Sequence, residues 1–502
     1  MTDGPATDED EPGPAPDRRA ETTVVPGPVV PGPVEIPASV TVPAGAAAVP
    51  SPALAPAAVP APPGAEAPTS VPAPAPDPVA ARLVPRRWWG WAAVATVVAL
   101  LACGVPAALL TALVDRDDDR PAAGRASVAS DDPATLAARR VGERLTAQLD
   151  RQAAALLGGD RAGFLAVADR GVRAELTRRF AALRALRVSV WRAEPEGLPT
   201  PVAGRSGQWR QQVTFRYCLV VPDCTPSPVL VATRWREGGD APLLLAVEES
   251  RSARTGARPW EVSELVVAVG ARTVVATTPA LRGKLPGLLA EAEEAAKVAD
   301  LYAVPGPPPD RYRVFYAGRA EWRRWYGGGR PKWTAGYAVG VGGGHHEVVL
   351  NADALPTAGP GELLRHELTH AASLPDRGHP GRPTWWLVEG LAEYAGADGA
   401  PVSRYDGLDE VRRLVTGGWD GRLEALAPAD TAPADRVGGS YGVGYLAVRH
   451  LVDRYGEQQV LAFFRSVVHD RRPVDEASER VLGERWSTLH DECVGYLRSV
   501  AG

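Results

Sequence analysis

The feature that most constrains the fold is a pair of histidines, His366 and His370, in the motif HELTH, followed after eighteen intervening residues by Glu389. On a helix, residues four apart lie on one face, so both imidazoles can turn toward a single ion, with Glu367 beside them. A catalytic zinc site needs a third protein ligand and one open position, and two histidines with one glutamate form such a set. The chain must therefore bring a second helix, predicted to begin after Thr384, against the first.

These residue types predict the activation of a water molecule. Zinc would lower the pKa of the water that it binds, and Glu367 would take the proton and later pass it to the leaving amine. Asp376 stays open as an alternative third ligand, and His379 lies close to it in the sequence. The pattern does not fit a metzincin, because that class would have glycine and histidine where this chain has Ser373 and Asp376.

The motif HELTH and the segment EGLAEY, which begins at Glu389, resemble the gluzincin metallopeptidases. This clan includes thermolysin-like enzymes and the zinc aminopeptidases, and the resemblance covers the chain from residue 270 to residue 500. It implies that His366, His370 and Glu389 bind zinc. It also implies that Glu367 is the general base.

The same resemblance implies that Glu393 supports the site through a contact with one of the ligands. One departure from the family pattern affects the expected substrate. Aminopeptidases of the clan use a Gly-x-Met-Glu-Asn segment to grip the free amine, and this chain has no such segment, since its one methionine is Met1. We therefore expect an endopeptidase rather than an aminopeptidase.

The expected oxyanion-stabilising residue lies in a glycine-rich stretch, residues 438–444, which is predicted to be a loop that leads into a helix. The stretch contains Tyr441, and Tyr445 follows four residues later, so the two would share a helix face. Related peptidases carry a tyrosine near such a helix start, where its hydroxyl can steady the oxyanion. We expect Tyr441 in this role, with Tyr445 as the second choice and a half-buried packing residue as the alternative.

Upstream of the zinc helix, residues 337–341 and 347–351 read as a β-hairpin. Residues 342–346 would join its strands, and we expect His345 and His346 to lie in a solvated turn rather than to bind metal. In the clan such a strand lies beside the active site. An exposed edge there could bind an extended peptide by main-chain pairing.

Residues 88–114 form a run of 27 residues without a charged side chain, long enough to cross a hydrocarbon core of about 30 Å. Arg86 and Arg87 precede the run, and Asp115 and Asp117 follow it. The basic flank should stay in the cytoplasm. This pattern predicts a single-pass protein of the cell membrane, with a cytoplasmic N-terminus and an extracytoplasmic catalytic part.

Composition limits the remaining partners. Residues 1–85 hold 22 of the 49 prolines, and such a segment cannot bury a core, so we expect a disordered tail. Its Pro-Gly-Pro and Pro-Ala-Pro stretches could bind a partner protein. The formal net charge of −5, with 52 Arg and 3 Lys, gives no basic surplus that would indicate nucleic-acid binding.

The predicted fold class is α+β: a zincin-like catalytic domain, with a small β lobe and a helical lobe, preceded by a cystatin-like α+β roll. The 388 residues beyond the span exceed the usual size of one domain. The predicted division is a disordered Pro/Ala-rich tail, a transmembrane helix, a linker, the roll and a gluzincin-like metallopeptidase domain, at residues 1–85, 86–114, 115–132, 133–270 and 271–502.

Within the roll, two helices over residues 137–157 and 161–183 are expected to precede a curved antiparallel sheet, whose last strand is predicted over residues 260–269. No catalytic cluster is evident in this region. We expect a spacer or a ligand-capturing module. Cys218 and Cys224 bracket a strand end and turn, and a local disulfide between them would suit an extracytoplasmic location.

Two functions compete at this point. The first is a membrane-anchored, zinc-dependent peptidase that cleaves peptide or protein substrates outside the cytoplasm, with Glu367 activating the water bound to zinc. The second is a catalytically degenerate zinc-binding or sensor protein that acts through its membrane-proximal roll. The intact set of His366, Glu367, His370 and Glu389 favours the first.

Overall fold

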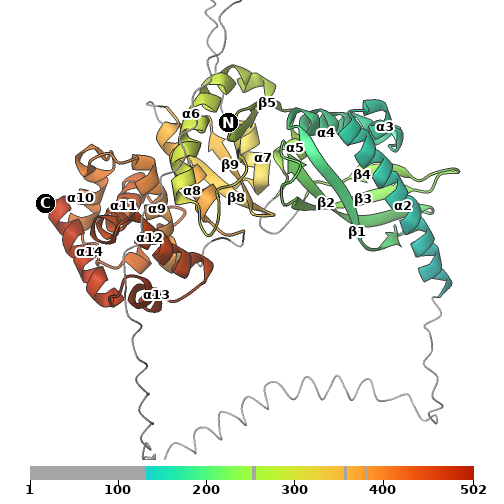
Figure 1. Ribbon diagram of the computed structural model, residues 1–502. Helices are drawn as coiled ribbons and strands as arrows, with labels where there is room; N and C mark the ends of the chain where they lie inside the picture. Colours follow the sequence, from blue (N-terminus) through green and yellow to red (C-terminus); the bar gives the residue numbers. More distant parts are fainter. Residues whose placement is uncertain (1–131, 251–255, 356–358, 377, 379–380) are drawn as a thin grey trace, which may run out of the picture. The chain divides into compact units, whose positions relative to one another are not determined.

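The structure, a computed structural model, describes residues 132–250, 256–355, 359–376, 378 and 381–502, all within one compact unit of the chain (Figure 1). No helix in this described part is long and apolar enough to cross a membrane. The predicted tail and membrane span, and the predicted linker up to residue 131, lie outside the described residues and stay predictions.

Four helical segments open the described part: α2 (Pro133–Gly158), α3 (Arg161–Ala166), η1 (Arg170–Val172) and α4 (Arg173–Ala185). α2 begins where the Asp132 carboxylate accepts hydrogen bonds from two backbone N–H groups of the first turn. It ends at Gly159, whose φ of 75° suits a residue without a side chain. The single helix predicted over residues 161–183 is broken, because Asp169 caps a new helical turn there.

The first sheet is antiparallel and follows these helices. Its strands lie in sequence order: β1 (Val188–Pro201), β2 (Gln208–Leu219), β3 (Ser227–Arg236) and β4 (Leu243–Val247). The helices cover one face, and aromatic side chains fill the space between, with the rings of Trp191 and Phe215 stacked at 4.9 Å. Helices followed by an antiparallel sheet is the predicted order of elements. The closer likeness to a cystatin-like roll stays a prediction, and we keep the name roll for residues 133–247.

The second sheet has five strands in the order β5-β6-β7-β9-β8. The strands are β5 (Val266–Val269), β6 (Thr273–Thr277), β7 (Tyr312–Ala317), β9 (His345–Asn351) and β8 (Gly336–Gly342). The three central strands are parallel, and the outer strands β5 and β8 are antiparallel to their neighbours. β8 is therefore an edge strand, and it forms the predicted hairpin with β9.

The strand predicted over residues 260–269 was wrong in its first half. Residues Pro259–Val262 form the short helix α5, because Pro259 suits a first helical position and the Glu261 carboxylate accepts a hydrogen bond from the Arg258 backbone N–H at 2.7 Å. The second half is β5, which pairs with β6 of the second sheet rather than with the sheet of the roll.

Side chains of the second sheet alternate between two apolar cores. Val275, Val314 and Val348 face helices α6 (Leu285–Ala299) and α8 (Gly361–Ser373). Their neighbours on the opposite face, which include Phe315 and Val349, belong to one continuous buried cluster with the roll. Alternation with period two on a sheet buried on both faces explains why these strands read as nearly unbroken apolar runs.

The turn of the β8–β9 hairpin differs from the prediction. His345 and His346 lie inside β9 and are each only 7% exposed, rather than in a solvated turn. The reason is that Gly343 and Gly344, with φ values of 70° and 75°, complete the turn by themselves. The remaining residues are thus left to pair as strands.

Residues 385–502 form a helical lobe. Its helices are α9 (Trp385–Ala397), α10 (Leu408–Thr416), α11 (Ala434–Tyr455), α12 (Glu457–Phe464), the π-helical turn η8 (Arg465–His469), α13 (Val474–Val481) and α14 (Trp486–Ala501). The glycine-rich stretch 438–444 was predicted to be a loop but lies within α11. Its glycines serve close packing: a Cβ placed on Gly390 of α9 would lie 2.3 Å from the Gly444 carbonyl oxygen.

The predicted local disulfide is confirmed. Cys218 and Cys224 form a disulfide that closes the loop between β2 and β3. Cys493 is buried within α14.

Candidate metal centre

Helix α8 carries the two histidines of the HELTH motif. Leu364 and Leu368 are fully buried against the second sheet and fix one face of the helix. His366 and His370, one turn apart, project from another face, and their ring centroids are 4.7 Å apart. They are 8% and 7% exposed, so both imidazoles are largely shielded from solvent.

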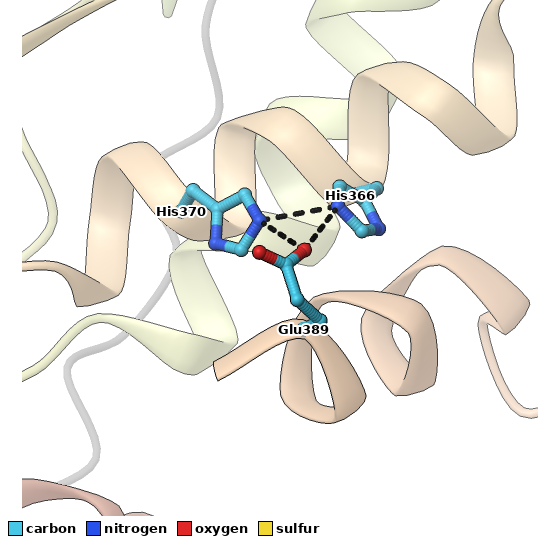
Figure 2. Close-up of side chains that lie close together, drawn as sticks. All are labelled: His366, His370 and Glu389. Carbon is cyan, nitrogen blue, oxygen red and sulfur yellow. Dashed lines mark hydrogen bonds and ion pairs between the residues drawn. The ribbon is translucent and has the colours of Figure 1, made fainter. Parts of the chain in front are cut away.

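Glu389 reaches the same point from α9. Its Oε2 lies 3.1 Å from His370 Nε2 and 3.3 Å from His366 Nε2, and Figure 2 shows the three side chains converging. One donor atom from each residue lies within 4.8 Å of the others, and among the described residues this is the group of histidine and carboxylate ligands close enough to hold a metal ion. Two imidazole nitrogens and one carboxylate oxygen are the donor set of catalytic zinc. The residues therefore fit a zinc ion, as predicted.

Asp376, the alternative third ligand, is engaged elsewhere. Its Oδ2 accepts a hydrogen bond from the Gly344 backbone N–H at 3.0 Å, in the β8–β9 turn. It is not in the group that could hold a metal. His379 lies outside the described residues.

A second layer of contacts orients the ligands. Glu393, one turn after Glu389, places its Oε1 3.1 Å from His366 Nδ1. The Tyr405 hydroxyl in turn donates to Glu393 Oε2 at 2.7 Å. Such a carboxylate fixes the ring so that the other nitrogen is free to bind metal. The position that the family resemblance assigned to Glu393 is the one observed.

Electrostatics favour charged groups at the centre. Burial alone would raise the pKa of Glu389, but His370 and His366 lower it well below its usual range. Burial would lower the pKa of His366, yet hydrogen bonds and charge from Glu389 and Glu393 raise it well above its usual value. The carboxylates thus provide the negative charge that a cation at this point would need.

Glu367 lies beside the ligands and against the edge strand. A Cβ placed on Gly336 of β8 would lie 2.7 Å from Glu367 Oε1, so only a residue without a side chain leaves room for this carboxylate. Its Oε2 is buried and has no hydrogen-bond partner among the described residues. Burial raises the pKa of Glu367. A carboxylate with an unused acceptor and a raised pKa is suited to take up a proton.

Tyr441 on α11 faces this group. Its ring lies 6.0 Å from that of His366 and 5.0 Å from that of Trp385, and Trp333 packs edge-on against it at 6.3 Å. Burial and the nearby carboxylates raise the pKa of Tyr441 well above 10, so the hydroxyl keeps its proton. The described residues offer it no recorded hydrogen bond.

Tyr445, the second choice, points elsewhere although it is one turn away. Its ring is fully buried and stacks on Tyr405 at 4.4 Å, and its hydroxyl accepts from Arg449 at 3.3 Å. The helix that carries both tyrosines thus brings Tyr441 to the metal centre and leaves Tyr445 in the core.

The two tryptophans that pack against Tyr441, Trp333 and Trp385, were not predicted to lie near it. Trp385 belongs to the helix opening that the sequence located, but nothing in its spacing distinguishes a wall residue from a core residue. Trp333 precedes the edge strand in a stretch rich in glycine and proline, where no periodicity exists to orient a side chain. Both are found only through the three-dimensional contact with Tyr441.

Comparison with known proteins adds little to this geometry. No protein-family model and no curated protein matches the chain. Similar solved structures include the M1 zinc metallopeptidase from Deinococcus radiodurans, 18% identical over 63% of this chain and 61% of that chain, with a TM-score of 0.27. Native yeast LTA4 hydrolase is another, 12% identical over 60% of this chain and 43% of that chain, with a TM-score of 0.31. The chain spans less than two thirds of either structure, and a likeness of this degree carries no functional argument.

Proposed function

We propose that this chain is a zinc-dependent peptidase. The observation that carries the proposal is the convergence of His366 Nε2, His370 Nε2 and a Glu389 oxygen within 4.8 Å, with Glu367 beside them. The donor set suits zinc, and the adjacent carboxylate suits a general base.

The roles of the residues follow from their positions. Zinc held by the three ligands would polarise the scissile carbonyl as a Lewis acid. It would also lower the pKa of a bound water molecule toward neutrality. Glu367, with its free Oε2, takes a proton from the attacking water and passes it to the leaving amine. The Tyr441 hydroxyl, uncommitted and protonated, donates a hydrogen bond to the oxyanion that develops on the substrate. Glu393 keeps the His366 ring in its metal-binding orientation.

The edge strand β8 offers a means of holding the substrate. Its outer main-chain groups are unpaired within the described sheet, and Gly336 brings the strand directly against Glu367. An extended peptide that adds to this edge would pass its backbone beside the base. The strand that binds the substrate and the residue that activates water are thus neighbours.

We favour internal cleavage over removal of N-terminal residues. The Arg330 guanidinium lies 4.0 Å over the ring of Tyr337 in β8. Burial raises the pKa of Tyr337, and the negative charge of Glu367 raises it further. Arg330 thus places a positive charge beside the edge strand, and a positive charge there disfavours a free substrate amine. The lack of a Gly-x-Met-Glu-Asn segment supports the same conclusion.

Location outside the cytoplasm, behind a single membrane anchor at residues 86–114, is also part of the proposal. It rests on the 27 uncharged residues with their basic N-terminal flank. The disulfide Cys218–Cys224 supports it, because such bonds persist in oxidising compartments. Protease protection of the folded part in sealed, right-side-out vesicles tests it: digestion from outside is expected, and full protection would contradict it.

The catalytic proposal is tested with the full chain, zinc analysis and a library of peptides with free and with acetylated N-termini. We expect one zinc per chain, cleavage of both sets, and a kcat for Glu367→Gln lower by about 10²- to 10⁴-fold with the zinc content unchanged. Cleavage restricted to free N-termini would reverse the preference for internal cleavage. Zinc binding without any cleavage would favour the zinc-binding or sensor alternative instead.

A further inference from the structure

The loop between β2 and β3 of the roll lies directly on the turn of the β8–β9 hairpin. The Ser227 hydroxyl donates to the Gly342 carbonyl oxygen at 3.0 Å. His345 Nε2 lies 3.1 Å from the Thr225 carbonyl oxygen, and burial, followed by the charge of Arg313, lowers the pKa of His345 to about 4. The ring is therefore neutral near pH 7, and its Nε2–H can donate to that carbonyl.

The turn has no room for side chains on the side of the roll. A Cβ on Gly343 would lie 2.5 Å from the Thr225 carbonyl oxygen, and a Cβ on Gly342 would lie 2.6 Å from Pro228. At Gly343 the backbones of two segments that are more than 100 residues apart in the sequence thus face each other without an intervening side chain, and at Gly342 the ring of Pro228 fills the space. Contacts of this kind transmit displacement, because a close-packed backbone cannot yield locally.

A buried charge cluster holds the same hairpin further along. Glu347 of β9 is fully buried, accepts a hydrogen bond from the Tyr217 hydroxyl of β2 at 3.1 Å, and lies 3.4 Å from Arg313. The Tyr326 hydroxyl donates to the other carboxylate oxygen. Removing one partner of a buried charge is strongly unfavourable, so the register of β9 against the roll is fixed.

The disulfide determines the shape of the loop that makes these contacts. Cys218 is the last residue but one of β2, and Cys224 precedes Thr225. The bond therefore joins residues that are six positions apart, immediately before the contact with the turn. Without the bond, Val220 and Val221 would still be held by hydrogen bonds to Arg187 and Ser189, while residues 222–224 would gain conformational freedom.

Displacement of the turn would reach the catalytic residues along β8. The strand runs from the turn to Gly336, which lies against Glu367. On its other side the turn is held to the segment after α8, because the Gly344 N–H donates to Asp376. The position of the edge strand relative to the base is therefore set partly by the roll.

We infer that the disulfide-closed β2–β3 loop of the roll positions β8 for substrate binding, so that the roll is a working part of the peptidase rather than a spacer. This inference rests on the proposed peptidase function. Ser227, Cys218 and Cys224 are positioning residues: they touch the hairpin or shape the loop, and they do not touch the metal ligands.

The test compares full-length variants. Ser227→Ala removes the hydrogen bond to Gly342 and also the one that the hydroxyl accepts from Arg313 at 3.3 Å, and the double variant Cys218→Ser with Cys224→Ser frees the loop. We expect KM for an extended peptide to rise about 5-fold in the first, as for the loss of the hydrogen bond to the hairpin, and more in the second, with kcat within about 2-fold of wild type and unchanged zinc content. Thr146→Ala is the matched control, because its hydroxyl donates to the Gly142 carbonyl within α2, away from the hairpin.

Hydrogen exchange separates positioning from general destabilisation and needs no activity. Amides of residues 336–344 should exchange faster in Ser227→Ala, while those of α8 and α9 stay as in wild type. Unchanged KM and unchanged exchange at residues 336–344 in an active Ser227→Ala variant would overturn the inference and leave the proposed function intact. A wild-type chain that binds zinc but cleaves no peptide would overturn the proposed function instead.

Discussion

The two sides of the metal centre are held in different ways. On one side, α9 and α11 meet backbone to backbone at Gly390 and Gly444 within an apolar core. On the other, the β8–β9 hairpin is held to the roll by hydrogen bonds that Ser227 and Tyr217 donate. Apolar close packing fixes the ligands with little tolerance, whereas a polar contact worth about 1 kcal/mol can be broken without unfolding. Metal binding should therefore be robust, and substrate binding adjustable.

The largest expected effect comes from breaking the packed side. Gly390→Ala places a Cβ 2.3 Å from the Gly444 carbonyl oxygen, so the two helices must separate. We expect a loss of about 3 kcal/mol in the free energy of unfolding, measured by denaturant titration. Gly287→Ala in α6 is the control, because no atom lies within 4 Å of its Cβ position. Equal stability of both variants would show that α9 and α11 separate at little cost.

Tyr441 sharpens the comparison within a single helix. Removing its hydroxyl in Tyr441→Phe should lower kcat about 100-fold, the effect of losing one oxyanion donor, with KM and zinc content little changed. Tyr445→Phe removes a hydroxyl bonded to Arg449 in the core and should lower thermal stability while kcat is retained. Similar kcat values for the two variants would remove Tyr441 from the mechanism.

Glu393→Gln tests how the ligand side is tuned. The amide keeps the shape of the carboxylate but loses the negative charge beside His366. Zinc affinity, measured by competition with a chelator, should fall about 10- to 100-fold. An affinity equal to that of wild type would mean that helix packing alone orients the His366 ring.

The smallest effect belongs to the hairpin side and depends on pH. The pKa of His345 in the folded state is about 4, below the ordinary value of 6.5, so the unfolded chain binds more protons between these values. Stability from this residue is therefore complete above pH 6.5 and is lost as pH falls toward 4. We expect about 2 kcal/mol less stability at pH 5 than at pH 7 from this residue. His345→Gln should reduce that slope in thermal melts, and an unaltered slope would assign it to other groups.

The sequence predicted the parts of the site whose spacing is local. Helical periodicity placed His366 and His370 on one face, and the family resemblance supplied Glu389 and Glu393. The predictions from the sequence were wrong where packing between distant segments overrides local sequence signals. The glycines of residues 438–444 are typical of a loop. They nevertheless lie in helix α11, where the absence of a side chain at Gly444 allows helix α9 to pack closely at Gly390.

The hairpin shows the same limit. His345 and His346 follow three glycines and were predicted to lie in a turn, but both belong to β9, and Thr225 of the roll contacts His345. Nothing near residue 345 in the sequence indicates a contact with residue 225. Contacts between distant segments produce no periodic pattern in either segment. The position of Trp333 beside Tyr441 and the contact between the roll and the hairpin therefore could not be predicted.

The pairing of β8 with β9 shifts register between Gly340 and Gly342, which leaves Gly336–Gly340 as its regular stretch. On an edge strand, alternate residues turn their main-chain groups outward, so five residues offer only two or three points of attachment. A peptide that forms hydrogen bonds to only these few residues is recognised by its extended conformation more than by its sequence. A peptidase built in this way would accept many unfolded segments and would spare folded proteins, whose strands are already paired.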